Sequence, residues 1–228
     1  MPKPFDEAHA ATYDQHFAAL APMRDALQLV TGLALGELPA GARILCAGAG
    51  TGAELLYLAA AFPGWRFTAV DPSGPMLRRC RAKAEAAGVA DRCRFHEGTV
   101  EELPGEAGDH DGATALLVSQ FLVDRAAREA FFRAIAGRLR PGAPLVVADL
   151  AAPSLSGELI ALWKRAWLHA GVPPEQVARM AETLAEQVAV LPPDEVAAIV
   201  AAGGFDEPLR CFQSILIHGW LARRSASP

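Results

Sequence analysis

The run RILCAGAGTG at residues 43–52 constrains the fold of this chain more than any other stretch. It opens with a short apolar segment, too brief for a helix and bounded by glycines, which indicates a buried strand of a parallel sheet. The following residues 53–61, AELLYLAAA, have a helical composition. A strand, a glycine turn and a helix in this order are typical of a nucleotide site, because glycine lets the backbone approach a ligand closely.

A second strand is predicted at residues 66–70, and it ends in Asp71, nineteen residues after Gly52. In a doubly wound sheet, an acidic side chain about 20 residues beyond the glycines holds a ribose by its hydroxyl groups. The glycine run and Asp71 together therefore favour a ligand that contains a nucleoside.

The remaining pattern completes an α/β fold. Further strands are predicted at residues 92–96, 111–118 and 143–149, with an amphipathic helix at 125–139 before the last of them. Five strands that alternate with helices predict a parallel, doubly wound sheet with helices on both faces. The last two strands, at 210–213 and 215–222, are joined by a link so short that they must pair antiparallel. We therefore expect a Rossmann-like, seven-stranded sheet of five parallel strands and a C-terminal antiparallel pair.

Two segments outside this alternation are predicted to form a helical lid on a single domain over residues 1–228. Apolar side chains recur at every third or fourth position within residues 1–38, which indicates an N-terminal helical segment. Residues 151–190 are predicted to be a helical insertion, with helices at 154–170 and 175–190.

Bulk properties narrow the class of protein. The chain has 228 residues and a net charge of -5, so we expect no global attraction to nucleic acid or to an anionic membrane. No apolar run of about 18 residues is present to span a membrane. The four cysteines lack CxxC spacing, which favours the cytoplasm, and no metal-ligand pattern stands out. The expected partner is a small-molecule acceptor. The sequence is also compatible with a homodimer.

Motifs at several places carry a family resemblance: the glycine run Gly48 to Gly52, Val70-Asp71-Pro72-Ser73 with Met76, Gly98-Thr99-Val100, Leu139-Arg140-Pro141-Gly142 and the terminal strand pair. This succession resembles the class I S-adenosylmethionine-dependent methyltransferases over nearly the whole chain. The glycine run also fits GxGxxA, a dinucleotide fingerprint. A dehydrogenase would normally carry a longer sheet or a substrate domain, so we favour S-adenosylmethionine over NAD.

The resemblance implies which residues hold the cofactor. The glycines would leave room for its methionine part, Asp71 would accept hydrogen bonds from the ribose, and Met76 would pack on adenine, unless it belongs only to the core. Leu117 and Ser119 would face the sulfonium at the end of the fourth strand. With Tyr13 from the N-terminal lid, the predicted set is Tyr13, Ala47, Gly48, Gly50, Gly52, Asp71, Pro72, Met76, Thr99, Val100, Leu117 and Ser119.

The predicted substrate contacts are His16, Gln120, Trp163 and Trp167. For the two tryptophans the alternative is a structural role, because an aromatic stripe at helical spacing usually belongs to a core. Asp149 is either a substrate contact or the cap of the next helix. A general base is needed only if the acceptor loses a proton, and no catalytic residue is assigned. The histidines to test are His9, His16, His169 and His218.

A narrower similarity concerns the segments Gln120-Phe121-Leu122, Gly157-Glu158-Leu159, Lys164-Arg165 and Gly204-Phe205, with Cys211-Phe212-Gln213. They resemble the branch that contains carboxy-S-adenosylmethionine synthase and related methyltransferases. That synthase is implied to hold a carboxylate co-substrate with arginine, tyrosine and histidine near the start of the last helix. This chain has LPPDE at 191–195 instead, which favours ordinary methyl transfer to a small molecule. A noncatalytic S-adenosylmethionine-binding protein is the alternative from another class.

Overall fold

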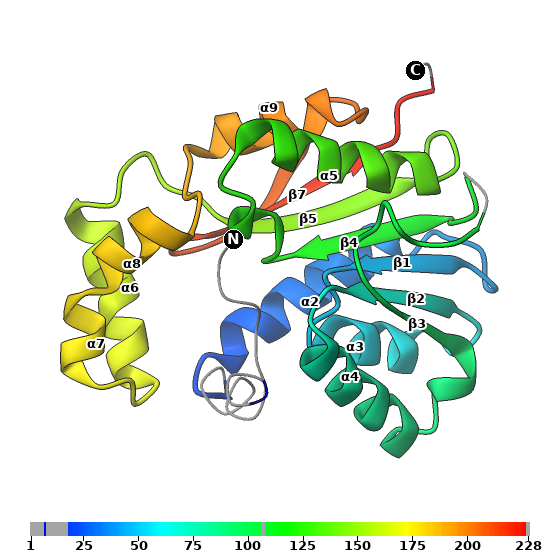
Figure 1. Cartoon of the computed structure of the whole chain (residues 1–228), viewed down its shortest axis with the longest axis horizontal. Coiled ribbons are helices and arrows are strands. Elements are labelled where there is room, and N and C mark those ends of the chain that lie inside the picture. The colour runs from blue at the N-terminus through cyan, green and yellow to red at the C-terminus, as the bar shows by residue number, and fades with distance from the viewer. Residues whose placement is uncertain (1–6, 8–17, 106–107, 227–228) are drawn as a thin grey trace.

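The structure is a computed structural model that describes residue 7, residues 18–105 and residues 108–226. At its centre is a seven-stranded sheet with the order β3-β2-β1-β4-β5-β7-β6 (Figure 1). Strands β1 to β5 are parallel, and β7 lies antiparallel between β5 and β6, which confirms the predicted Rossmann-like sheet. The strands are β1 (Arg43–Ala47), β2 (Arg66–Asp71), β3 (Cys93–Glu97), β4 (Gly112–Leu116), β5 (Pro144–Leu150), β6 (Leu209–Ser214) and β7 (Ile217–Arg223).

Helices cover both faces of the sheet, as predicted (Figure 1). Successive residues of β1 point to opposite faces. Leu45 therefore joins the core cluster beneath α5 and α9, while Ile44 and Cys46 join the cluster beneath α3 and α4. The helices that cover the sheet are α2 (Ala21–Leu35), α3 (Ala53–Ala61), α4 (Gly74–Ala86), α5 (Arg125–Arg138) and α9 (Pro193–Ala202). In the described part of the chain, no helix is long and apolar enough to cross a membrane.

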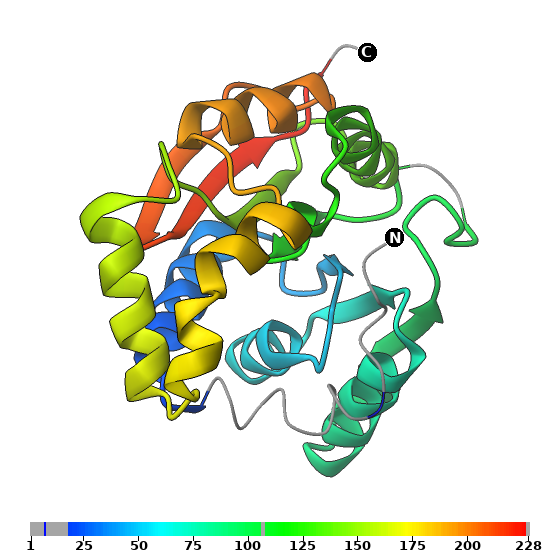
Figure 2. The ribbon, with the colours of Figure 1, turned by 60° about the vertical axis from the view of Figure 1, so that its left-hand side comes forward.

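The insertion before α9 forms three helices beyond the carboxyl ends of the parallel strands (Figures 1 and 2). They are α6 (Gly157–His169), α7 (Pro174–Ala178) and α8 (Met180–Gln187). The helix predicted at 175–190 is broken at Arg179, which no local signal announces, because arginine is a good helix former. A third core cluster joins this insertion to α2 and to the ends of β5 and β7.

Two strand boundaries differ from the prediction because of the backbone at one residue each. β4 ends at Leu116, since Leu117 adopts φ 57°, and β7 begins at Ile217, since Ile215 in the preceding turn adopts φ 54°. Side-chain-bearing residues rarely adopt these left-handed conformations, so sequence patterns favour continued strands. At the N-terminus, α2 occupies part of the predicted helical segment, while His9, Tyr13 and His16 lie outside the described residues.

Candidate functional site

The glycine loop between β1 and α3 folds back onto the end of β2. The amides of Gly48 and Ala49 both donate to the carbonyl oxygen of Val70, at 2.8 and 3.0 Å. Gly48, Gly50 and Gly52 have φ values of 73°, 53° and 85°, a region in which glycine carries no side-chain penalty. The loop therefore places a tight run of main chain at the carboxyl edge of the sheet, as the sequence predicts for a nucleotide site.

The glycines differ in what surrounds them. A Cβ on Gly48 would lie 2.3 Å from a methyl group of Val118, and one on Gly52 would lie 2.6 Å from Sγ of Cys80. A Cβ on Gly50 would meet only the terminal methyl group of Met76, at 3.6 Å. Neighbouring side chains thus leave no room for a Cβ at Gly48 or Gly52. At Gly50, the tip of the loop has open space.

Asp71 links the tip of the glycine loop to the start of α4. Its Oδ2 accepts a hydrogen bond from the amide of Gly50, and its Oδ1 accepts one from the amide of Ser73, both at 2.8 Å. Burial raises the pKa of Asp71, while these two amides lower it. Each carboxylate oxygen retains a further lone pair, so the fixed carboxylate can still accept hydrogen bonds from two hydroxyl groups.

Glu54, in the first turn of α3, is a buried acid that the sequence analysis missed. Burial is the main cause that raises its pKa from 4.5 to about 7, and the negative charge of Asp71 adds to the effect. Two carboxyl groups thus lie near the glycine loop with unequal tendencies to ionise. The signal available in the sequence was an acidic residue two positions after Gly52, at a helix start, where it reads as an ordinary N-terminal charge.

Four further residues of the predicted cofactor set lie near the start of α4 and in the turn after β3. Met76 is buried, and the hydroxyl of Ser73 accepts a hydrogen bond from its amide at 3.4 Å, which caps the start of α4. Pro72 is exposed beside them, and Val100 is buried in the core beneath α5. Thr99 is exposed, but its amide already donates to the Glu102 carboxylate at 2.8 Å.

At the ends of β4 and β5, Arg128 of α5 forms a buried ion pair with Asp149 at 2.9 Å. Arg128 also donates to the hydroxyl of Ser119 at 2.8 Å, and this hydroxyl donates to Asp149 at 2.5 Å. Asp149 further accepts from the amide of Gln120 at 3.0 Å, so it caps η2 (Ser119–Phe121) rather than α6. Burial raises the pKa of Asp149, and Arg128 opposes that shift. Ser119 therefore lies in a polar core network.

Leu117 and Gln120, the other predicted residues of this edge, fix the connection from β4 to α5. The amide of Leu117 donates to the carbonyl oxygen of Ala148 at 2.6 Å, which holds its left-handed backbone against β5. The side chain of Gln120 accepts from the amide of Leu150 at 2.6 Å, and its main-chain carbonyl accepts from the amide of Ala189 at 2.7 Å. Gln120 is buried and ties the end of the helical insertion to the sheet.

Trp163 and Trp167 lie together on α6, with ring centroids 5.8 Å apart and an interplanar angle of 82°. Trp163 is buried in the cluster that also contains Leu27, Ala148 and Leu150, and Trp167 packs against this cluster half-buried. Trp163 thus anchors the insertion to β5. Trp167 is the more accessible of the two predicted aromatic contacts.

The two described candidate histidines are placed very differently. His169 is exposed at the end of α6. His218 is buried on β7 directly opposite Asp149 of β5, and burial lowers its pKa. Neither ring nitrogen of His218 has a hydrogen-bond partner within the described residues. In the same part of the chain, no group of three or more histidine, cysteine or acidic side chains is arranged to hold a metal ion.

Comparison with known proteins finds a family match over part of this chain. Residues 44–142 match the family model described as a methyltransferase domain. The ubiquinone biosynthesis O-methyltransferase of Methylocella silvestris is 36% identical over 110 residues, which cover 48% of this chain and 40% of that protein. The aligned parts span only 36% and 40% of the length of curated relatives that match.

Solved structures show the same fold. An O-methyltransferase family protein from Burkholderia thailandensis superposes with a TM-score of 0.70 over 98% of this chain and 61% of that chain, at 16% identity. The geranyl diphosphate C-methyltransferase of Streptomyces coelicolor superposes with a TM-score of 0.63 over 88% of this chain and 76% of that chain, at 14% identity. That structure contains S-adenosyl-L-homocysteine.

Proposed function

We propose that this chain, with its match to a methyltransferase domain between residues 44 and 142, is an S-adenosylmethionine-dependent methyltransferase for a small-molecule acceptor. The observation that carries the proposal is the link between Gly50 and Asp71. This hydrogen bond supports a site in which the accessible main chain at Gly50 lies beside the fixed Asp71 carboxylate, whose oxygens keep free lone pairs. This combination suits a ligand that joins a ribose to an amino-acid part.

The described residues fit such a cofactor. Gly50 leaves space where a side chain would otherwise project, and Asp71 offers acceptors for ribose hydroxyls. We assign Met76 to the adenine side, because a buried, polarisable thioether packs well against a ring. The bound cofactor would supply a methyl group that its sulfonium makes electrophilic.

The chain's own contribution is then to position an acceptor and to exclude water. We infer that α6 to α8 cover the acceptor, because they stand beyond the strand ends at which the glycine loop lies (Figure 2). Trp167 is our candidate for an acceptor contact, because it is less buried than Trp163. Held close and in line, an acceptor reacts without further covalent chemistry from the protein.

The similarity to O-methyltransferases makes a hydroxyl group the first acceptor to test. We infer ordinary methyl transfer rather than the carboxy-S-adenosylmethionine synthase reaction, because Leu191 to Glu195 lack the arginine, tyrosine and histidine that the synthase is implied to use. In this proposal Gln120 acts through the main chain of Leu150 that it holds in place, and Ser119 acts through the side chains of Asp149 and Arg128.

The test is the release of S-adenosylhomocysteine from S-adenosylmethionine in a screen of phenolic and aliphatic hydroxyl acceptors. The proposal expects release that depends on one acceptor class and that falls in Asp71→Ala. Tight cofactor binding without release for any acceptor would favour the noncatalytic binding protein instead. Binding of NAD in preference to S-adenosylmethionine would contradict both.

A further inference from the structure

The connection from β3 to β4 leaves part of the sheet without a helical cover. Helices α3, α4 and α5 fill the other crossovers between parallel strands, whereas the described residues 98–105 and 108–111 contain no helix (Figure 1). Val100 and Leu103 of this connection belong to the core cluster that contains Val70, near the carboxyl end of β2. The amino halves of β1 to β3 therefore stay open on the face that α5 covers farther along the sheet.

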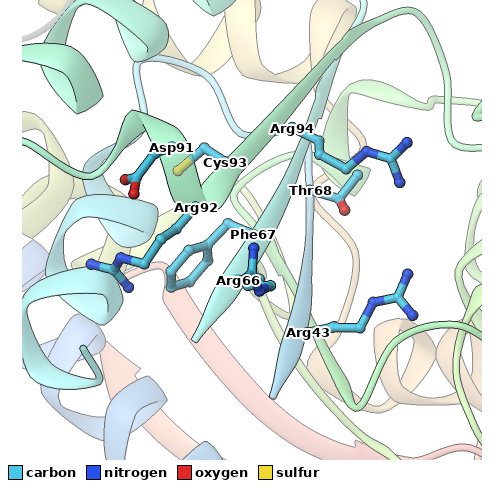
Figure 3. A pocket seen from close by; sticks show the side chains of 8 residues that line it. All are labelled: Arg43, Arg66, Phe67, Thr68, Asp91, Arg92, Cys93 and Arg94. Carbon is cyan, nitrogen blue, oxygen red and sulfur yellow. The ribbon is translucent and has the colours of Figure 1, made fainter. Parts of the chain in front are cut away.

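Arginine side chains gather on this open area. Arg43 of β1 pairs in register with Arg66 of β2, and Thr68 of β2 pairs with Arg94 of β3. Residues in register on parallel strands, and residues two apart on one strand, share a face, so all four lie on the same side of the sheet. Figure 3 shows Arg43 and Arg94 extending to the same side with Thr68 between them.

These side chains line a hollow of about 280 Å³ at the amino ends of the strands. A second hollow of about 150 Å³ shares Arg43, Thr68 and Arg94 with the first and adds Arg138. The charged residues that line the two hollows are five arginines and two aspartates, Arg43, Arg66, Arg92, Arg94, Arg138, Asp91 and Asp109. The lining therefore has an excess of positive charge on a chain whose net charge is -5.

The arginines differ in how many hydrogen bonds and ion pairs their guanidinium groups already form. Arg92 donates to three main-chain carbonyl groups at the end of α3, and Arg138 donates to the carbonyl oxygen of Gly105. Arg43 shares a half-exposed ion pair with Asp109 at 3.4 Å. Arg66 and Arg94 are exposed and form no ion pair within the described residues. Two guanidinium groups, and part of a third, are thus available to an anion.

We propose that these hollows bind a compact phosphate-bearing small molecule, such as a phosphate ester or a diphosphate. Guanidinium groups bind phosphate oxygens through paired, charge-assisted hydrogen bonds, and arginine has the planar geometry for such pairs. The Thr68 hydroxyl already contacts Nε2 of His110 at 3.0 Å, which fixes its position between Arg43 and Arg94. The small hollows and the acidic chain favour a compact anion over an extended polyanion.

This site is separate from the proposed methyl-transfer site. Arg43 begins β1, and the glycine loop begins five residues later, which is about 16 Å at 3.3 Å per residue. A ligand of this size cannot bridge the two ends of the strand. We therefore assign the arginine hollows to an effector or a tethering group, and not to the methyl acceptor.

The test is calorimetric titration of the full chain with sodium pyrophosphate at low ionic strength. We expect saturable binding with a dissociation constant below about 1 mM. Arg66→Gln and Arg94→Gln should each weaken it by about tenfold or more, the loss typical of a charge-assisted contact. Arg133→Gln is the matched control, because Arg133 is exposed on α5 and lines neither hollow. Absence of saturation, or equal weakening in the control, would overturn the proposal.

A second titration uses a single-stranded oligonucleotide in place of pyrophosphate. Much tighter binding than that of pyrophosphate, with a steep loss on adding salt, would replace the compact ligand with nucleic acid. S-adenosylmethionine affinity is measured in the same variants, and we expect it to be unchanged. Unaltered thermal unfolding of Arg66→Gln and Arg94→Gln shows that any lost binding is not lost folding.

Discussion

Arg128 and Asp149 form an ion pair in which both side chains are almost completely buried, 1% and 0% exposed. The pair joins α5 to the carboxyl end of β5, and its remaining bonds reach η2 and the carbonyl oxygen of Ala189. It therefore holds together α5, β5, η2 and the end of the helical insertion at the proposed acceptor side of the site.

Loss of one partner of this pair should destabilise the chain strongly. Arg128→Met leaves the Asp149 carboxylate buried without its cation, and we expect the free energy of unfolding to fall by about 3 to 5 kcal/mol. Urea denaturation followed by circular dichroism measures this. Arg133→Met, on the exposed side of the same helix, should change stability by less than about 0.5 kcal/mol. Similar losses in the two variants would show that the ion pair is not structural.

Glu54 should make stability depend on pH. Its pKa is raised to about 7 in the folded chain, so the protonated form stabilises the fold. That contribution to the free energy of unfolding is roughly 3 kcal/mol. It is fully present below pH 4.5, the pKa of Glu54 in the unfolded chain, and it is lost as the pH rises to about 7. Glu54→Gln should therefore unfold at higher urea concentration than the original chain at pH 8, but not at pH 4.5. Parallel pH profiles for the two proteins would contradict the raised pKa.

Gly48 and Gly137 should respond oppositely to alanine. Gly48→Ala brings a Cβ to 2.3 Å from Val118 at a positive φ, so we expect loss of stability by about 1 to 3 kcal/mol. At Gly137, inside α5, a Cβ meets nothing within 4 Å, and alanine should stabilise by roughly 0.5 to 1 kcal/mol. Thermal unfolding compares the two, and a neutral Gly48→Ala would disprove the close contact.

Trp167 should matter for the acceptor and not for the cofactor. Because it lies on α6 and not at the glycine loop, Trp167→Ala should raise the acceptor KM while S-adenosylmethionine affinity changes less than about twofold, or 0.4 kcal/mol. Steady-state kinetics with the acceptor found in the screen, and calorimetry with the cofactor, separate the two effects. A large loss of cofactor affinity would show that α6 contacts the cofactor.

Local patterns were sufficient for the sheet and the glycine loop. Short stretches of sequence contain the strand composition, the glycines and the spacing to Asp71. The strands and the glycine turn that they predict are present in the structure. The order of the strands in the sheet was not predicted, because it depends on contacts between strands that are far apart in sequence. The connection from β3 to β4 has no helix among its described residues, and the arginines beside it were not predicted to be a site.

The buried polar network could not be predicted, because its partners are far apart in sequence. Arg128 lies four residues before Phe132 and seven before Ile135, so its position on the inward face of α5 was a readable signal. The identity of its partner on β5 could not be recognised, because the sequence is equally compatible with Asp149 as a helix cap or as a ligand contact. The left-handed backbone of Leu117 also escapes sequence patterns, because residues with a side chain rarely adopt this conformation.

The central claim is that Asp71 and the glycine loop bind S-adenosylmethionine, and calorimetric titration of the purified chain tests it most directly. We expect micromolar affinity, and Asp71→Ala should weaken it by about 1.5 to 3 kcal/mol, the range for hydrogen bonds to a charged group. Asp91→Ala, an exposed acid at the opposite end of the sheet, is the control and should bind normally. Absence of binding, or equal affinity in Asp71→Ala, would contradict the account.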